Sequence, residues 1–149
     1  MSPKFSLQPV LDFRHNRVEA LEIELSQVLA EQKVAAGRLE TLQAYQLRLF
    51  EDLHRQQEGD LDMFVVNSLR SNLKIVQDSL RRQQTVLHEL EQQVAAKRQE
   101  VVGAKQSEET LITLKNKEVE RFLNEQASRD NRVQDDIYIA QAFRRAASL

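Results

Sequence analysis

The sequence predicts an all-α protein built as a long antiparallel two-helix coiled-coil hairpin with short helices at its tip. Three observations point to this fold class. Glycine and proline are rare, at 3 and 2 of 149 residues, whereas charged residues make up 30%. Aromatic residues reach only 5%, too little bulk to fill a wide globular core. Apolar positions also recur at alternating spacings of three and four residues, which is the pattern of a narrow coiled-coil seam.

The first helix is expected over residues 7–58. Pro9 then lies in its first turn, where backbone N–H groups have no helical partner. The predicted seam positions are Leu11, Arg14, Val18, Leu21, Leu25, Val28, Gln32, Ala35, Leu39, Leu42, Gln46, Leu49 and Leu53. At a rise of 1.5 Å per residue this helix is roughly 75 Å long, which is too long for a compact core.

The tip is expected over residues 59–72. Gly59 follows Glu58 and precedes Asp60, and glycine readily ends helices, so this is the main stop signal inside the chain. The apolar residues that follow keep a helical spacing, and a lone strand would have nothing to pair with. We therefore expect short helices that bracket a turn.

The second helix is expected over residues 73–145, so that residues 1–149 form a single helical hairpin. Its predicted seam positions are Leu73, Val76, Leu80, Gln83, Leu87, Leu90, Val94, Lys97, Val101, Ala104, Glu108, Leu111, Lys115, Glu118 and Phe122. The apolar repeat weakens between Ala104 and Glu118, where Ile112, Leu114 and Val119 offer alternative positions. This indicates a local stutter in the coiled coil.

The two seams can be docked because facing residue numbers in an antiparallel pair have a constant sum. A sum near 140 places Leu49 beside Leu90 and groups the polar residues Gln32 and Glu108 in one layer. It also places Gly37 opposite Gly103. Two explanations of the glycines stay open: a packing or bending role, or the coincidence of two exposed positions.

Charge and composition argue against several classes of function. The net charge is −2 and the pI is about 6.0, so no basic field exists for nucleic acid or anionic lipid. No stretch approaches eighteen apolar residues, so membrane insertion is not expected. The first residues lack the apolar run of a secretory signal. Together with the absence of cysteine, these features favour a cytoplasmic protein.

Catalysis is not expected either, and neither are a cofactor or a metal. The three glycines are far apart, so no nucleotide-binding loop can be written. His15, His54 and His88 are isolated in sequence; His54 and His88 could meet only across the tip, and two histidines make a weak metal site. A two-helix hairpin also lacks the pocket that general acid–base chemistry needs.

The remaining candidates are surfaces for partners. The N-terminal segment is apolar on more than one side, through Phe5, Leu7, Val10, Leu11 and Phe13. It either covers the C-terminal helix at Val133 and Ile137 or binds a partner, and both can hold. A second candidate is the ridge of Tyr45, Leu47 and Phe50, which lie off the seam. The cluster around Phe64 is a third, although we expect it to be used in closing the hairpin.

The N-terminal residues resemble a known family. Phe5-Ser6-Leu7-Gln8-Pro9-Val10-Leu11-Asp12-Phe13-Arg14, followed by Glu19 and a leucine repeat, is similar to the opening of the FliJ family, small coiled-coil proteins of flagellar and related type III export machines. The far end agrees in kind, since Lys117–Phe122 leads through a polar stretch to Asp135-Asp136 and a last apolar turn. The resemblance covers the whole chain.

The resemblance implies a central stalk of a hexameric export ATPase, and an escort that links this ATPase to the export gate protein and to substrate chaperones. It implies a cytoplasmic protein peripherally associated with the membrane export apparatus. The expected ATPase-binding residues are Phe5, Leu7, Gln8, Val10, Leu11 and Arg14, with Phe143, Arg144 and Arg145 beside them. Tyr45, Leu47 and Phe50 are the expected second partner surface.

Other functions stay open beside this one. The chain could be a non-flagellar coiled-coil scaffold, or an adaptor for another secretion or pilus ATPase. A scaffold predicts that truncation before Asp12 matters little, whereas a nucleic-acid or membrane-surface binder predicts strong salt dependence, against which the net charge counts. The sequence also leaves open a monomeric hairpin or a homodimer that forms a four-helix bundle.

Overall fold

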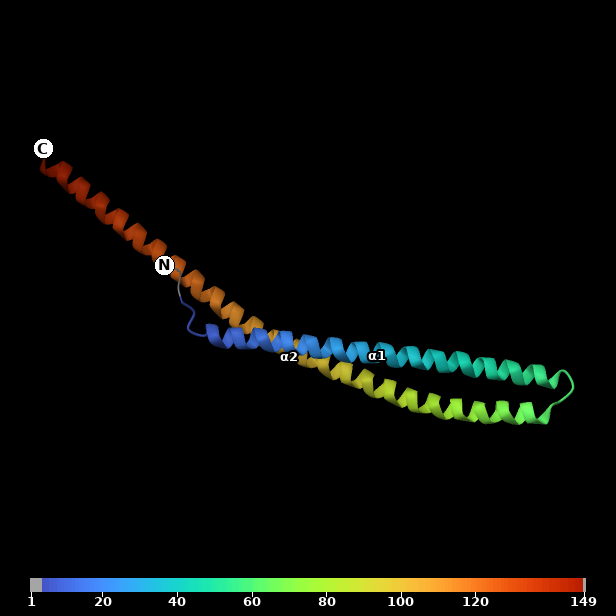
Figure 1. The fold of residues 1–149 in the computed structure, drawn as a ribbon. Coiled ribbons are helices and arrows are strands. Elements are labelled where there is room, and N and C mark those ends of the chain that lie inside the picture. The colour runs from blue at the N-terminus through green and yellow to red at the C-terminus, as the bar shows by residue number, and fades with distance from the viewer. Residues whose placement is uncertain (1–3, 149) are drawn as a thin grey trace. The chain divides into compact units, whose positions relative to one another are not determined.

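The computed structural model describes residues 4–148 and contains two α-helices within them. Helix α1 spans Gln8–Gln57 and helix α2 spans Met63–Ala147 (Figure 1). The described residues include no strand, and the two long helices pack against each other with opposite chain directions. The predicted all-α class and the antiparallel pairing of two helices are confirmed.

The predicted short helices at the tip are not present. Residues 58–62 connect the helices, and α2 begins at Met63 and continues without a break. Asp62 explains this start: its Oδ1 accepts a hydrogen bond from Phe64 N at 3.0 Å, and its carbonyl accepts one from Val66 N at 3.0 Å. Asp62 is thus the N-cap, which satisfies a backbone donor that would otherwise lack a partner.

The chain divides into two compact units, which we describe separately. The hairpin unit is Glu19–Val102, and the terminal unit consists of the described residues up to Val18 and from Gly103 onward. In the hairpin unit, Leu49, Val76 and Leu80 are buried in one cluster. Four half-buried leucines pack against this cluster, namely Leu39, Leu42, Leu69 and Leu73. The core is therefore a narrow strip between two helices.

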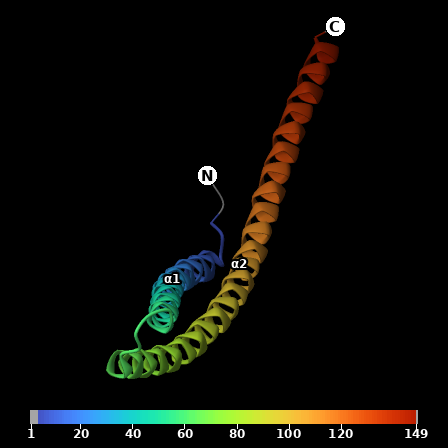
Figure 2. The same ribbon diagram turned by 90° about the vertical axis from the view of Figure 1, so that its right-hand side faces the viewer.

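In the terminal unit, the start of the chain packs along α2. Phe5, Leu11 and Leu111 form a small buried cluster, and Ile112 packs against it. Beyond Phe122, every described residue of α2 is exposed. Figures 1 and 2 show this last part of α2, coloured orange to red, running past the N-terminal segment as a single helix.

The predicted seam agrees with the burial of side chains along both helices. Every predicted seam position from Leu11 to Leu53 and from Leu73 to Phe122 is buried or half-buried. The polar members Gln46, Gln83 and Lys97 are among them. The alternation of three- and four-residue spacings therefore identified the contact faces of both helices.

The predicted register of these faces is wrong. In the terminal unit, Arg14 contacts Ser107, His15 contacts Glu108 and Gln8 contacts Lys115, so facing residue numbers sum to 121–123. In the hairpin unit, Glu24 contacts Lys97, which sums to 121. The prediction of 140 therefore displaced the helices by about 18 residues, or roughly 27 Å at 1.5 Å per residue. The tip explains about half of this error, because a connection at residues 58–62 centres the hairpin near residue 61, whereas a tip at 59–72 had centred it near residue 65. The rest came from grouping Gln32 and Glu108 in one layer.

Gly37 and Gly103 do not face each other in the observed register. In the hairpin unit, Gly37 lies at the level of Thr85 rather than of Gly103. A Cβ atom added at Gly37 or at Gly103 would meet no atom within 4 Å. Neither glycine therefore serves a close approach of another element.

Candidate partner-binding surfaces

The opening motif of the chain is divided between two faces of the terminal unit. Phe5 and Leu11 are buried, at 9% and 8% exposed, and pack with Leu111 of α2. Leu7 and Val10 point to the outer side, at 38% and 41% exposed. The two buried side chains hold the N-terminal segment on α2, and Leu7 and Val10 are among the apolar side chains left for a partner.

The polar residues of the motif are also used within the chain. Arg14 donates a hydrogen bond from Nη1 to the carbonyl of Ser107 at 2.7 Å. Lys115 Nζ donates to Gln8 Oε1 at 2.8 Å, and Gln8 Nε2 donates to Asp12 Oδ1 at 2.9 Å. These contacts fix how α1 begins along α2. Gln8 and Arg14 therefore position the outward residues in addition to any contact they make themselves.

His15, the residue after the motif, makes a further polar contact with α2. His15 Nδ1 lies 2.9 Å from Glu108 Oε1, and the pair becomes an ion pair when the imidazole is protonated.

Phe13 lies on the outer side with 70% of its surface exposed, one helical turn from Val10. The expected site residues omitted Phe13, although its place in an apolar segment was visible in the sequence.

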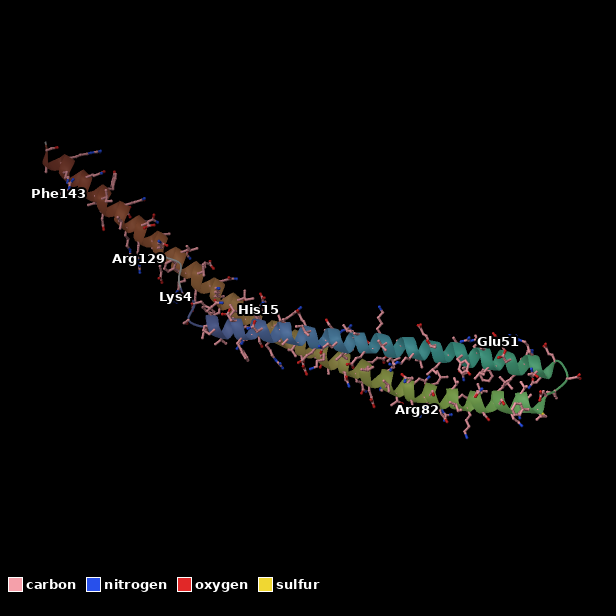
Figure 3. All side chains as sticks on the ribbon, viewed as in Figure 1. Lys4, His15, Glu51, Arg82, Arg129 and Phe143 are labelled. Atoms are coloured by element: carbon pink, nitrogen blue, oxygen red, sulfur yellow. The ribbon has the colours of Figure 1, made fainter. Side chains whose placement is uncertain are left out.

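Phe143, Arg144 and Arg145 are not beside the opening motif. All three are exposed on α2, and Phe143 lies roughly 48 Å along that helix from Leu111, at 1.5 Å per residue. Figure 3 shows Phe143 near the far end of this helix, well separated from Lys4 and His15. The expectation came from the family resemblance, whereas the packing of Phe5 and Leu11 on Leu111 places the N-terminal segment much earlier along α2.

The same change of register leaves the C-terminal segment uncovered. Val133 and Ile137 are 56% and 52% exposed, so the N-terminal segment does not cover them. Tyr138 and Ile139 are also exposed, at 72% and 63%. This makes the C-terminal segment an apolar surface that the sequence reasoning had assigned in part to the interior.

Tyr45, Leu47 and Phe50 are all exposed, at 39%, 60% and 47%, but they do not form one ridge. At about 100° per residue, Tyr45 and Leu47 point to nearly opposite sides of α1. Leu47 and Phe50 are neighbours one turn apart, whereas Tyr45 carries the guanidinium of Arg48 over its ring at 5.8 Å. The predicted second surface is therefore reduced to Leu47 and Phe50 on one side and Tyr45 on another.

The tip presents apolar side chains to solvent. Leu61, Met63 and Phe64 are 60%, 54% and 78% exposed. Phe64 does not close the hairpin as expected; Val66, which is 5% exposed, is buried there instead. The early start of α2 at Met63 explains this, because it turns Phe64 outward.

His54 and His88, which could have met across the tip, each contact a residue of their own helix. His54 Nε2 contacts Glu58 on its own helix at 3.0 Å, and His88 contacts Gln92 at 3.2 Å. Within residues 4–148, no group of three or more His, Asp or Glu side chains is arranged to hold a metal ion. No helix in the same range is apolar over a length that would cross a membrane.

Comparison with known proteins identifies the family. The model of the flagellar FliJ protein family matches residues 3–148, which is nearly the whole chain. Searches of curated proteins and of solved structures found no match. The family match agrees with the opening motif, with the seam along both helices and with their antiparallel packing. The chain belongs to the FliJ family and is therefore a coiled-coil protein related to flagellar protein export, from a family of non-enzymatic components.

Proposed function

We propose that this chain is the central stalk of a hexameric export ATPase and an escort that links this ATPase to the export gate protein and to substrate chaperones. One observation carries the proposal. The opening motif presents Leu7 and Val10 outward while Phe5 and Leu11 are buried against α2. Together with the exposed Phe13, the two outward residues gather three apolar side chains at the start of α1, and a cluster of exposed apolar side chains is typical of a partner-binding surface.

The proposed contact with the ATPase begins at this outer face. Leu7, Val10 and Phe13 supply apolar contacts, and the bonds of Gln8 and Arg14 to α2 hold them in a fixed orientation. A preorganised surface loses less conformational freedom on binding than a flexible one. The N-terminal end of the hairpin thus presents a fixed helix pair rather than a loose tail.

Such a helix pair can act on a ring without catalysing anything. An asymmetric rod inside a ring of identical subunits contacts each subunit differently. If it binds one conformation of a subunit better than another, it shifts the populations of these conformations by that difference in affinity. We propose that the stalk coordinates the ATPase subunits in this way.

Phe143, Arg144 and Arg145 form a separate proposed contact. Phe143 is 76% exposed, and the two arginines beside it can form bidentate hydrogen bonds with carboxylates. Because the structure does not place these residues beside Leu7 and Val10, they would meet a different part of the ATPase. Loss of one contact is therefore expected to weaken binding without abolishing it.

The escort role is proposed for Leu47 and Phe50. They lie on the hairpin unit, one helical turn apart on the exposed side of α1. An apolar pair on a helix surface fits the groove of a partner that recognises helices. We assign this pair to the substrate chaperones or the export gate protein, with Tyr45 as a contact on the other side of the helix.

The proposal is tested by a pull-down from native cell extract with mass spectrometry. Phe5→Ala and Leu11→Ala are unsuitable variants, because both residues are buried and their loss would loosen the N-terminal segment. A Leu7→Ala/Val10→Ala double variant removes only outward side chains. A matched control is Ile23→Ala/Val34→Ala, since Ile23 and Val34 are 60% and 55% exposed on the same helix.

We expect the wild type and the control to recover an export ATPase and the Leu7→Ala/Val10→Ala variant to recover several-fold less. Recovery of no ATPase by the wild type would contradict the stalk proposal. The identity of the recovered ATPase separates flagellar export from the alternative, in which the chain serves another secretion system or a pilus.

A further inference from the structure

The C-terminal segment, residues 123–148, is a helix with an apolar stripe and no cover. Val133, Ile137, Ala140 and Ala147 are spaced by four, three and seven residues, so they lie on one face of α2. Phe143 flanks this face. No described side chain of the segment is buried. We call these five residues the C-terminal stripe.

A helix of this kind is expected to need a partner. Most helical stability in proteins comes from packing of an apolar face against a neighbour. The described part of the N-terminal segment packs at Leu111 and Ile112 and does not reach the stripe. We therefore look for an occupant of the stripe in another molecule.

The charges beside the stripe indicate which molecule fits. Asp135 and Asp136 lie before Ala140, and Arg144 and Arg145 lie at the same separation after it. At about 100° per residue, Asp136 and Arg144 lie about 40° from Ala140 and flank the stripe, whereas Asp135 and Arg145 lie about 140° from it and face away. A second copy of the segment in the antiparallel direction brings Asp136 of each copy to the level of Arg144 of the other. A parallel copy places like charges side by side, which is unfavourable. The sequence around Ala140 is thus complementary to itself in one direction only.

We propose that the C-terminal segments of two copies of this chain pair in antiparallel fashion about a two-fold axis at Ala140. The small side chain of Ala140 lets the helices approach at the axis. Ile137 of each copy then packs near Phe143 of the other, and Val133 packs near Ala147. The interface is isologous and closed, so association stops at the dimer.

This inference goes beyond the proposed stalk function and does not depend on it. The contact uses the same face as Phe143 and Arg144, so a self-paired dimer would have to separate before these residues met an ATPase. The dimer is thus the expected state of the free protein, in which the apolar stripe is covered.

The geometry can be tested by cysteine cross-linking of the full chain, because the protein has no cysteine of its own. Ala140→Cys lies on the proposed axis and faces its own copy, so mild oxidation is expected to give a disulfide-linked dimer. Ala142→Cys is the matched control, since it lies about 160° around the same helix. Val133→Cys tests direction: it meets residue 147 in the antiparallel pair and its own copy in a parallel pair.

The charges are tested by analytical ultracentrifugation. Asp136→Arg and Arg144→Asp should each raise the Kd of the dimer several-fold, through loss of attraction and gain of repulsion. An equimolar mixture of the two variants should recover the association, because each supplies the charges that the other lacks. A protein that stays monomeric to high concentration, equal cross-linking at residues 133, 140 and 142, or no recovery in the mixture would overturn the proposal.

Discussion

The apolar residues of the opening motif fall into two groups with different roles in the terminal unit. Phe5 and Leu11 are buried against Leu111, whereas Leu7 and Val10 face outward. Both kinds are apolar, so residue type alone does not separate a structural role from a binding role. The distinction comes from the position of each residue relative to α2.

Leu11→Ala is expected to loosen the N-terminal segment. Removing a buried leucine costs about 2–3 kcal/mol, and the cluster that it leaves is small. Amide hydrogen exchange in residues 8–18 should therefore become faster, while exchange in Glu19–Val102 stays near the wild-type rate. Leu7→Ala is the control, because that side chain is exposed. Equal exchange in the two variants would contradict the assignment of Leu11 to the core.

Lys97 is the charged residue whose environment in the seam is best defined. Its Nζ donates to Glu24 Oε2 at 2.8 Å and to Glu100 Oε2 at 3.2 Å. The hydrogen bond with Glu24, and then that with Glu100, raises the pKa of Lys97 above its ordinary value of 10.5. A raised pKa means that the folded state holds this proton more tightly than the unfolded state does.

The resulting contribution to stability has a definite pH dependence. It is fully present below the unfolded pKa of 10.5 and is lost as the pH rises through the higher folded value. The difference in Tm between wild type and Lys97→Gln should therefore be constant from pH 7 to about pH 9.5 and then shrink above pH 10.5. Circular dichroism melts at each pH measure it. A difference that grows above pH 10.5 would refute the assignment.

At the scale of helices, one capping residue determines where α2 begins. Asp62 accepts a hydrogen bond from Phe64 N, and with this cap the apolar residues from Met63 onward belong to a single helix. Asp62→Ala is expected to lower the free energy of unfolding by about 1 kcal/mol. Asp60→Ala, in the connection between the helices, should have little effect. Chemical denaturation of both variants measures the difference; equal losses would show that Asp62 is not the cap.

The register is tested by disulfides within one chain. Leu49 and Leu73 belong to the same cluster of the hairpin unit, so a Leu49→Cys/Leu73→Cys variant should close a disulfide under mild oxidation. Leu49→Cys/Leu90→Cys, which follows the register predicted from the sequence, should not, because its positions are about 25 Å further apart along α2. Mass spectrometry after peptide digestion distinguishes them. A disulfide only in the second variant would restore the predicted register.

The sequence predicts the seam positions of the two helices but not their register. The seams were correctly predicted because apolar spacing depends only on the periodicity of each helix. The register was wrong because many antiparallel offsets of two leucine repeats match equally well, and the choice depends on the connection. Asp62 before Met63 was a cap signal that could have corrected the tip. The division of the motif into inner and outer faces required the register and so could not be read from the residues alone.

For the whole molecule, family membership and geometry support different parts of the function. The family match relates the chain to flagellar export. We propose that the chain acts through the outward face of the motif and the C-terminal stripe, whose side chains are exposed. An effect on an ATPase is expected to come from binding its subunits in different conformations.

The most direct test is the ATP hydrolysis rate of the purified export ATPase with increasing amounts of the full chain. We predict that the wild type changes the rate saturably and that the Ile23→Ala/Val34→Ala control does the same. Leu7→Ala/Val10→Ala should require at least about fivefold more protein for half of the effect, since two exposed apolar contacts are worth roughly 1–3 kcal/mol. A rate that stays unchanged at saturating wild-type protein would contradict the stalk function.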